Sequence, residues 1–116
     1  MKVATISLDI RWQNIEENLK RAEEFVTKAK ADECDVVVFP EVFNTGFIAD
    51  MGKYCEAPNC RTHQALQQFS LNHLISVVAG TTEKPANKKA NNLAFVFDHY
   101  GQQVARYSKL QPFNYA

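Results

Sequence analysis

An α/β fold with a mixed β-sheet is predicted by the order of the hydrophobic patterns along the chain. Short β-favouring runs alternate with segments of helical periodicity through the first eighty residues, which is typical of parallel strands joined by helices. Two further β-favouring runs then follow each other with only a short glycine-containing turn between them, which predicts an antiparallel hairpin. Parallel and antiparallel pairs in one chain together make a mixed sheet.

The first strand and the first helix are predicted within the first third of the chain. Residues 3–8 form a short β-favouring run that ends at a polar residue. Asn14 then offers a helix cap, and Glu17 three residues later has the spacing of a capping box. Apolar residues recur after this cap at steps of three and four, which predicts an amphipathic helix: Ile15, Leu19, Ala22, Val26 and Ala29.

Two more strands and a second helix are predicted in the middle of the chain. The continuous apolar run at 36–39 predicts a strand covered on both faces, and Pro40 ends it. Helical spacing predicts a helix over 62–73, and the apolar run 74–79 predicts a strand closed by Gly80.

Loops and the terminal hairpin complete the predicted order. Residues 43–60 lack sustained periodicity and predict a long connection of the kind that often serves a site. The polar stretch 81–91 predicts a turn or flap. The runs 93–97 and 103–107 predict the two strands of the hairpin, with Gly101 at the bend.

Composition excludes several classes of protein. The 116 residues carry 13 Lys and Arg against 13 Asp and Glu, so the basic surface that nucleic-acid binding requires is not expected. The apolar runs fall far short of the roughly 20 residues of a membrane span, and no signal-peptide pattern opens the chain, so we expect a cytoplasmic protein that does not bind membranes. Three cysteines favour reduced thiols, and the spacing of Cys55, Cys60 and His63 lacks the second pair of a zinc site, so we expect no metal.

Glu41 and Lys109 are the candidate catalytic residues. Each follows a predicted strand, and sites in α/β proteins gather at the carboxyl ends of strands. A partly desolvated carboxylate can take and return a proton, and a cation can stabilise an oxyanion, which together supply most of an acyl-transfer site. Each residue also has an ordinary interpretation, Glu41 as a surface residue of a turn and Lys109 as a solvated lysine.

The nucleophile of such a site is not evident in the sequence. Cys34 precedes a strand and is expected at the wrong end of the sheet, whereas Cys55 and Cys60 lie in the long connection without an evident activating base. Three aromatic residues near the predicted strand ends are expected to line a substrate pocket, although aromatic residues are more often part of the core: Phe43, Phe47 and Phe113.

Two segments of the chain resemble motifs of the nitrilase superfamily of carbon-nitrogen hydrolases. Residues 35–41, Asp-Val-Val-Val-Phe-Pro-Glu, with Thr-Gly-Phe at 45–47, resemble its first motif, and residues 98–109, ending in Tyr-Ser-Lys, resemble its second. The resemblance implies an αββα sandwich that hydrolyses amides or nitriles through Glu, Lys and Cys, without metal or organic cofactor. It assigns Glu41 as general base and Lys109 as stabiliser of the tetrahedral intermediate.

The cysteine motif of that superfamily lies downstream of the lysine, beyond residue 116. We therefore expect residues 1–116 to be the N-terminal part of one such domain, inactive alone and associated with a completing chain or a further copy of itself. The alternative is a non-catalytic binding or assembly module with the same fold. Gln111 stands where many members carry histidine, and the following Pro112-Phe113 resembles the branch related to ω-amidases.

Overall fold

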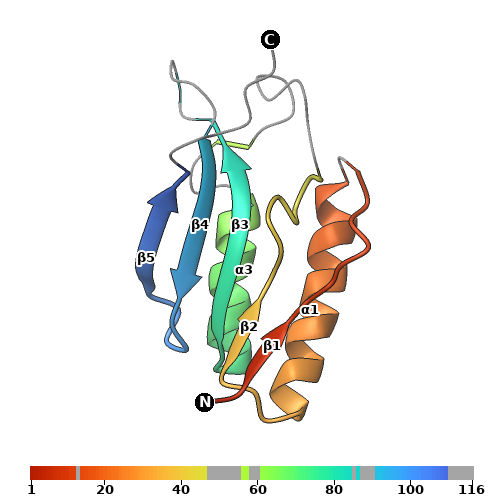
Figure 1. Ribbon diagram of the computed structural model, residues 1–116, viewed down its shortest axis with the longest axis vertical. Coiled ribbons are helices and arrows are strands. Elements are labelled where there is room, and N and C mark those ends of the chain that lie inside the picture. The colour runs from red at the N-terminus through yellow and green to blue at the C-terminus, as the bar shows by residue number, and fades with distance from the viewer. Residues whose placement is uncertain (13, 47–55, 58–60, 85, 87–90, 110–116) are drawn as a thin grey trace.

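A five-stranded mixed sheet organises the molecule (Figure 1). The computed structural model describes residues 1–12, 14–46, 56–57, 61–84, 86 and 91–109. The strands lie in the order of the sequence, and the first three are parallel whereas the last two pairs are antiparallel. The predicted mixed α/β fold is thereby confirmed. The strands are β1 (Val3–Thr5), β2 (Val36–Val38), β3 (Ser76–Glu83), β4 (Asn91–Phe97) and β5 (Gln103–Ser108).

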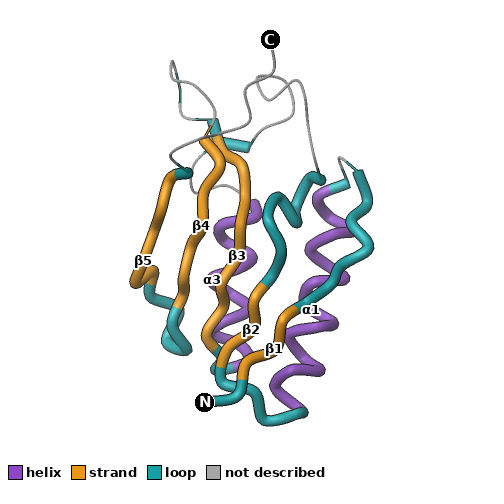
Figure 2. The backbone as a smooth tube through the Cα atoms, viewed as in Figure 1, coloured by secondary structure: helices purple, strands orange, loops and turns teal. Residues whose placement is uncertain are grey.

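The helices α1 (Ile15–Ala31) and α3 (Arg61–His73) lie on the same side of this sheet (Figure 2). Both were predicted from their periodicity, and the side chain of Asn14 accepts the expected capping bond from the amide of Glu17 at 3.2 Å. The core lies between the helices and the sheet, where removal of large apolar side chains from water stabilises the fold. Its fully buried members include Leu19, Val26, Leu66, Val37, Val77, Phe95 and Phe97.

The opposite face of the sheet is apolar but only half-buried. Side chains alternate between the two faces of a strand, so the neighbours of the core residues point away from the helices. Val36 and Val38 of β2, Val78 of β3 and Val96 of β4 are all half-buried in this way. Among the described residues no helix or second sheet covers this face, which we call the open face. The prediction that β2 is covered on both faces is therefore not met within the described part of the chain.

The boundaries of two predicted strands were wrong. β1 ends at Thr5, three residues before the end of the predicted run. β3 continues through Gly80 to Glu83, so residues 81–83 belong to the sheet and not to a flap. Gly80 does not end the strand because it pairs in register with Ala94 of β4. A long partner strand thus overrides the local tendency of glycine to end a strand.

The hairpin that joins β4 to β5 has the predicted turn. The carboxylate of Asp98 accepts bonds from the amides of Tyr100 and Gln102, at 2.9 and 3.0 Å. Gly101 adopts a φ of 77°, which glycine accommodates without steric cost. In the described part of the chain, neither helix is long and apolar enough to cross a membrane.

Candidate active site

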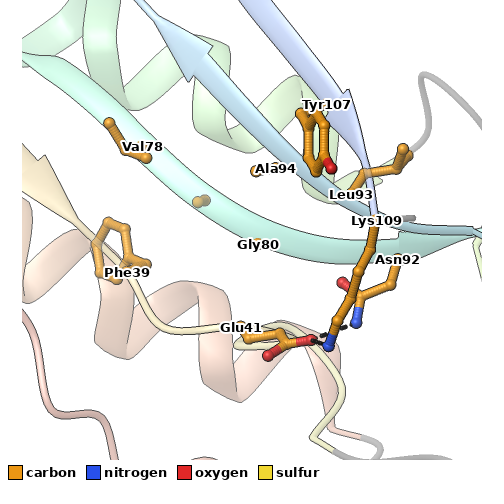
Figure 3. Close-up of a pocket in the computed structure, with 10 residues that line it drawn as sticks. Phe39, Glu41, Val78, Gly80, Asn92, Leu93, Ala94, Tyr107 and Lys109 are labelled. Carbon is orange, nitrogen blue, oxygen red and sulfur yellow. Dashed lines mark hydrogen bonds and ion pairs between the residues drawn. The ribbon is translucent and has the colours of Figure 1, made fainter. Parts of the chain in front are cut away.

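Glu41 and Lys109 meet at the carboxyl ends of β2 and β5 (Figure 3). The ammonium Nζ of Lys109 lies 3.1 Å from Oε1 of Glu41, although 68 residues separate them in the sequence. Their side chains are 46% exposed for Glu41 and 39% exposed for Lys109, so water reaches both. The described residues thus cover about half of the Glu41 side chain.

The backbone around Glu41 is held in an unusual conformation. Glu41 opens a turn after β2, and Val42 directly after it adopts a φ of 50°. Left-handed backbone is costly for a β-branched residue and is typical of functional sites where the surroundings enforce it. Two bonds hold the turn: the amide of Phe43 donates to the carbonyl of Gly80 at 3.3 Å, and the amide of Gly46 donates to the carbonyl of Val42 at 2.9 Å.

A buried polar network ties this turn to both helices. The side-chain amide of Asn18 in α1 donates to the carbonyl of Asn44 at 2.8 Å. The side-chain amide of Asn44 in turn donates to Glu56 at 3.1 Å and to the hydroxyl of Thr62 at 3.2 Å. The carboxylate of Glu56 also accepts the amide of Thr62 at the first turn of α3. The turn that carries Glu41 therefore rests on the N-terminal ends of α1 and α3.

Asn92 joins the site as a residue that sequence reasoning missed. It lies in β4, is 5% exposed, and its side-chain amide donates to Oε1 of Glu41. A single signal in the sequence could have pointed to it, because an asparagine at the start of an otherwise apolar strand must find a partner once it is buried. The pattern alone does not tell which partner that is.

A cavity of about 300 Å³ opens beside these three side chains on the open face of the sheet. Its walls are mostly apolar, and Glu41, Asn92 and Lys109 gather at one end of it (Figure 3). A mostly apolar pocket with a few convergent polar groups is the usual form of a small-molecule site. The remaining lining residues are Phe39, Val78, Ala79, Gly80, Leu93, Ala94 and Tyr107.

The three aromatic residues predicted to line a substrate pocket are not among those described around this cavity. Phe43 is fully buried in the core and stacks on Phe39, with ring centroids 5.2 Å apart. It stands behind the cavity wall that Phe39 provides. Phe47 and Phe113 lie outside the described residues. Tyr107, which pairs with Ala94 between β5 and β4, lines the cavity with an aromatic side chain. It was not among the lining residues predicted from the sequence.

Among the described residues, no cysteine lies at this end of the sheet. Cys34 is buried two residues before β2, at the amino end of that strand, as expected. Cys55 and Cys60 lie outside the described residues. Within the described part of the chain the site thus combines a carboxylate, an ammonium group and an amide, which can move a proton and stabilise a developing negative charge.

Comparison with known proteins matches this chain to a family model and to two hydrolases. A family model described as carbon-nitrogen hydrolase matches residues 2–116. The chain is 27% identical over 112 residues to the 2-oxoglutaramate amidase of Bacillus subtilis (strain 168), covering 96% of this chain and 43% of that protein. It is 27% identical over 130 residues to the aliphatic nitrilase of Rhodococcus rhodochrous, covering 96% of this chain and 34% of that protein.

The fold is shared with the solved structure of an amidase. The crystal structure of an amidase from Nesterenkonia sp. superposes with a TM-score of 0.88 at 18% sequence identity, over 98% of this chain and 44% of the amidase chain. The chain therefore spans less than half the length of the relatives it matches.

Proposed function

Because the chain belongs to the carbon-nitrogen hydrolase family, we propose that it forms the part of an amide- or nitrile-cleaving enzyme that carries the general base and the oxyanion-stabilising cation. The observation that carries this proposal is the 3.1 Å contact between Glu41 and Lys109 at one end of a mostly apolar cavity. Brought together at strand ends, a carboxylate can act as general base and an ammonium group can stabilise the oxyanion, the two roles that thiol acyl transfer uses besides the nucleophile.

In the proposed reaction the nucleophile is a cysteine supplied by a segment that follows residue 116. Glu41 removes the proton from the thiol, and the thiolate attacks the carbonyl carbon of the amide. Lys109 stabilises the negative oxygen of the tetrahedral intermediate. The intermediate collapses to a thioester as the proton held by Glu41 passes to the departing amine. Water, deprotonated by Glu41, then attacks the thioester, and the acid product leaves with regeneration of the thiol.

The open face of the sheet supports the proposal that further chain completes the domain. Val36, Val38, Val78 and Val96 leave an apolar surface half-covered, and more than half of the length of these relatives lies outside the matched part. A second layer of sheet packed on this face would bury these valines and produce the αββα sandwich. We propose that residues 1–116 alone are inactive for want of that layer and its cysteine.

We propose small ω-amides of dicarboxylic acids as the first substrate class. Support comes from Pro112-Phe113 after the lysine, which resembles the ω-amidase branch, and from the similarity to a 2-oxoglutaramate amidase. The reaction as written needs no metal or organic cofactor. A cytoplasmic location and association with further copies or a completing chain stay predictions.

The test is to sequence the coding DNA past codon 116, express the whole reading frame and measure ammonia release. Substrates are succinamate as an ω-amide, butyramide as a plain amide and butyronitrile as a nitrile. We expect a downstream cysteine and release of ammonia from at least one substrate, with loss on replacement of that cysteine by alanine. A reading frame without a further cysteine, or a whole protein that leaves all three substrates intact, would contradict the proposal.

A further inference from the structure

We propose that Asn92 is a positioning residue that holds the Glu41 carboxylate against Lys109, an inference that rests on the proposed function. Its side-chain amide donates to Oε1 of Glu41, and the same oxygen accepts the bond from Nζ of Lys109 at 3.1 Å (Figure 3). Two donors, one in β4 and one directly after β5, thus hold one oxygen of the carboxylate. Neither of these two hydrogen bonds is made to Oε2, so in this proposal that oxygen carries out proton transfer.

The main chain of Asn92 holds the other member of the pair. Its carbonyl oxygen accepts the backbone amide of Lys109 at 2.9 Å, which extends the pairing of β4 with β5 by one residue. Asn92 consequently contacts Glu41 through its side chain and Lys109 through its backbone. In this proposal one residue of β4, an inner strand of the sheet, sets the separation between base and cation.

Exposure explains why the pair needs such a residue. The side chains of Glu41 and Lys109 are 46% and 39% exposed, and an ion pair of this kind contributes little because water competes for both groups. Asn92 is 5% exposed, so its rotamer is restricted by packing and its hydrogen bond is shielded from water. The buried amide supplies the fixed geometry that two long, solvated side chains cannot supply themselves.

The residue type also suits the task. An asparagine amide donates a hydrogen bond without adding charge. It therefore orients the Glu41 carboxylate and does not alter the ionic interaction of that carboxylate with Lys109. An aspartate of the same shape would present a second carboxylate to Oε1 and repel Glu41. A leucine of similar size would fill the space without any donor. These two substitutions distinguish the effect of the hydrogen bond donated by Asn92 from the effect of the space that its side chain fills.

The kinetic test uses the whole reading frame with Asn92→Leu. We expect kcat to fall roughly 10- to 100-fold, the range produced by misplacing a catalytic group, with KM changed less than about threefold. The matched control is Thr82→Val, at the strand position paired with Asn92. Thr82 is as deeply buried as Asn92, and its hydroxyl has no hydrogen-bond partner among the described residues, so its loss should leave kcat unchanged. An unchanged kcat in Asn92→Leu would overturn the proposal.

A structural arm decides the role of Asn92 independently of catalysis. In crystal structures of Asn92→Leu and Asn92→Asp we expect Nζ of Lys109 and Oε1 of Glu41 to separate beyond hydrogen-bond distance, and in Thr82→Val to remain in contact. Asn92→Asp serves if Asn92→Leu does not fold. Persistence of the contact in the variants would exclude a positioning role even if the enzyme is active. An inactive wild-type enzyme would instead contradict the proposed function and leave this arm valid.

Discussion

Gly80 lies so close to Glu41 that a Cβ atom on residue 80 would stand 2.9 Å from the Cα atom of Glu41. Real Cβ atoms do not approach a backbone atom this closely, so either β3 or the turn after β2 would have to move. The absence of a side chain in the middle of a strand is therefore what allows the candidate base to lie over the sheet. The requirement is one of space, since β3 remains regular through this position.

Gly80→Ala should displace Glu41 and destabilise the fold. We expect a loss of about 1–3 kcal/mol in the free energy of unfolding, the usual cost of an added methyl group in a filled space. In the complete enzyme kcat should fall as Glu41 moves. Urea unfolding and steady-state kinetics measure the two effects. Ala31→Leu is the control, because it adds volume at an exposed position at the end of α1, away from the open face, and should change stability by less than about 0.5 kcal/mol.

Glu41→Gln and Lys109→Ala should each abolish most activity of the complete enzyme. Removing a group that transfers the proton or stabilises the oxyanion costs roughly 100- to 1000-fold or more in kcat. Thermal unfolding should change little, because both side chains are substantially exposed. Glu24→Gln and Lys20→Ala on the exposed side of α1 make the same chemical changes and should leave kcat as it is. Wild-type turnover in either site variant removes that residue from the mechanism.

Glycine should be tolerated at residue 42 far better than at residue 38. Val42 has a φ of 50°, which costs a β-branched residue about 1–2 kcal/mol and glycine almost nothing. Val42→Gly therefore relieves strain that offsets most of its entropic cost, and we expect a change within about 1 kcal/mol. Val38 is also half-buried but lies in β2, so Val38→Gly should lose clearly more. Equal losses in urea unfolding would show that the backbone at Val42 carries no strain.

Asn18→Ala should be among the most destabilising substitutions in α1. The buried side chain accepts the amide of Arg11 at 2.6 Å and donates to the carbonyls of Arg11 and Asn44 at 2.7 and 2.8 Å. Alanine would leave these groups without that partner, at a cost of roughly 2–4 kcal/mol. Asn14→Ala removes only the helix cap and should cost about 1 kcal/mol. A difference between the two smaller than the fitting error of chemical unfolding would contradict the burial argument.

Local patterns in the sequence were sufficient for the elements whose signals are periodic. The apolar spacing from Ile15 to Ala29 and the cap at Asn14 predicted α1, because helical side chains share a face every three to four residues. The short turn with Gly101 predicted the hairpin between β4 and β5. The positions of Glu41 and Lys109 just after strands indicated the candidate site, since β2 and β5 run in the same direction and their carboxyl ends lie at one edge of the sheet.

Contacts between distant segments were decided only by the tertiary structure. The register of β3 against β4 carries the sheet through Gly80 to Glu83, and no local pattern around Gly80 encodes its partner. The same register brings Asn92 to Glu41, and the burial of Phe43 in the core depends on how the turn after β2 folds back. Period, caps and turn residues are properties of neighbouring residues and can be read in sequence. That the buried amide of Asn92 contacts the carboxylate of Glu41 depends on strand pairing across tens of residues, and only the folded chain specifies this pairing.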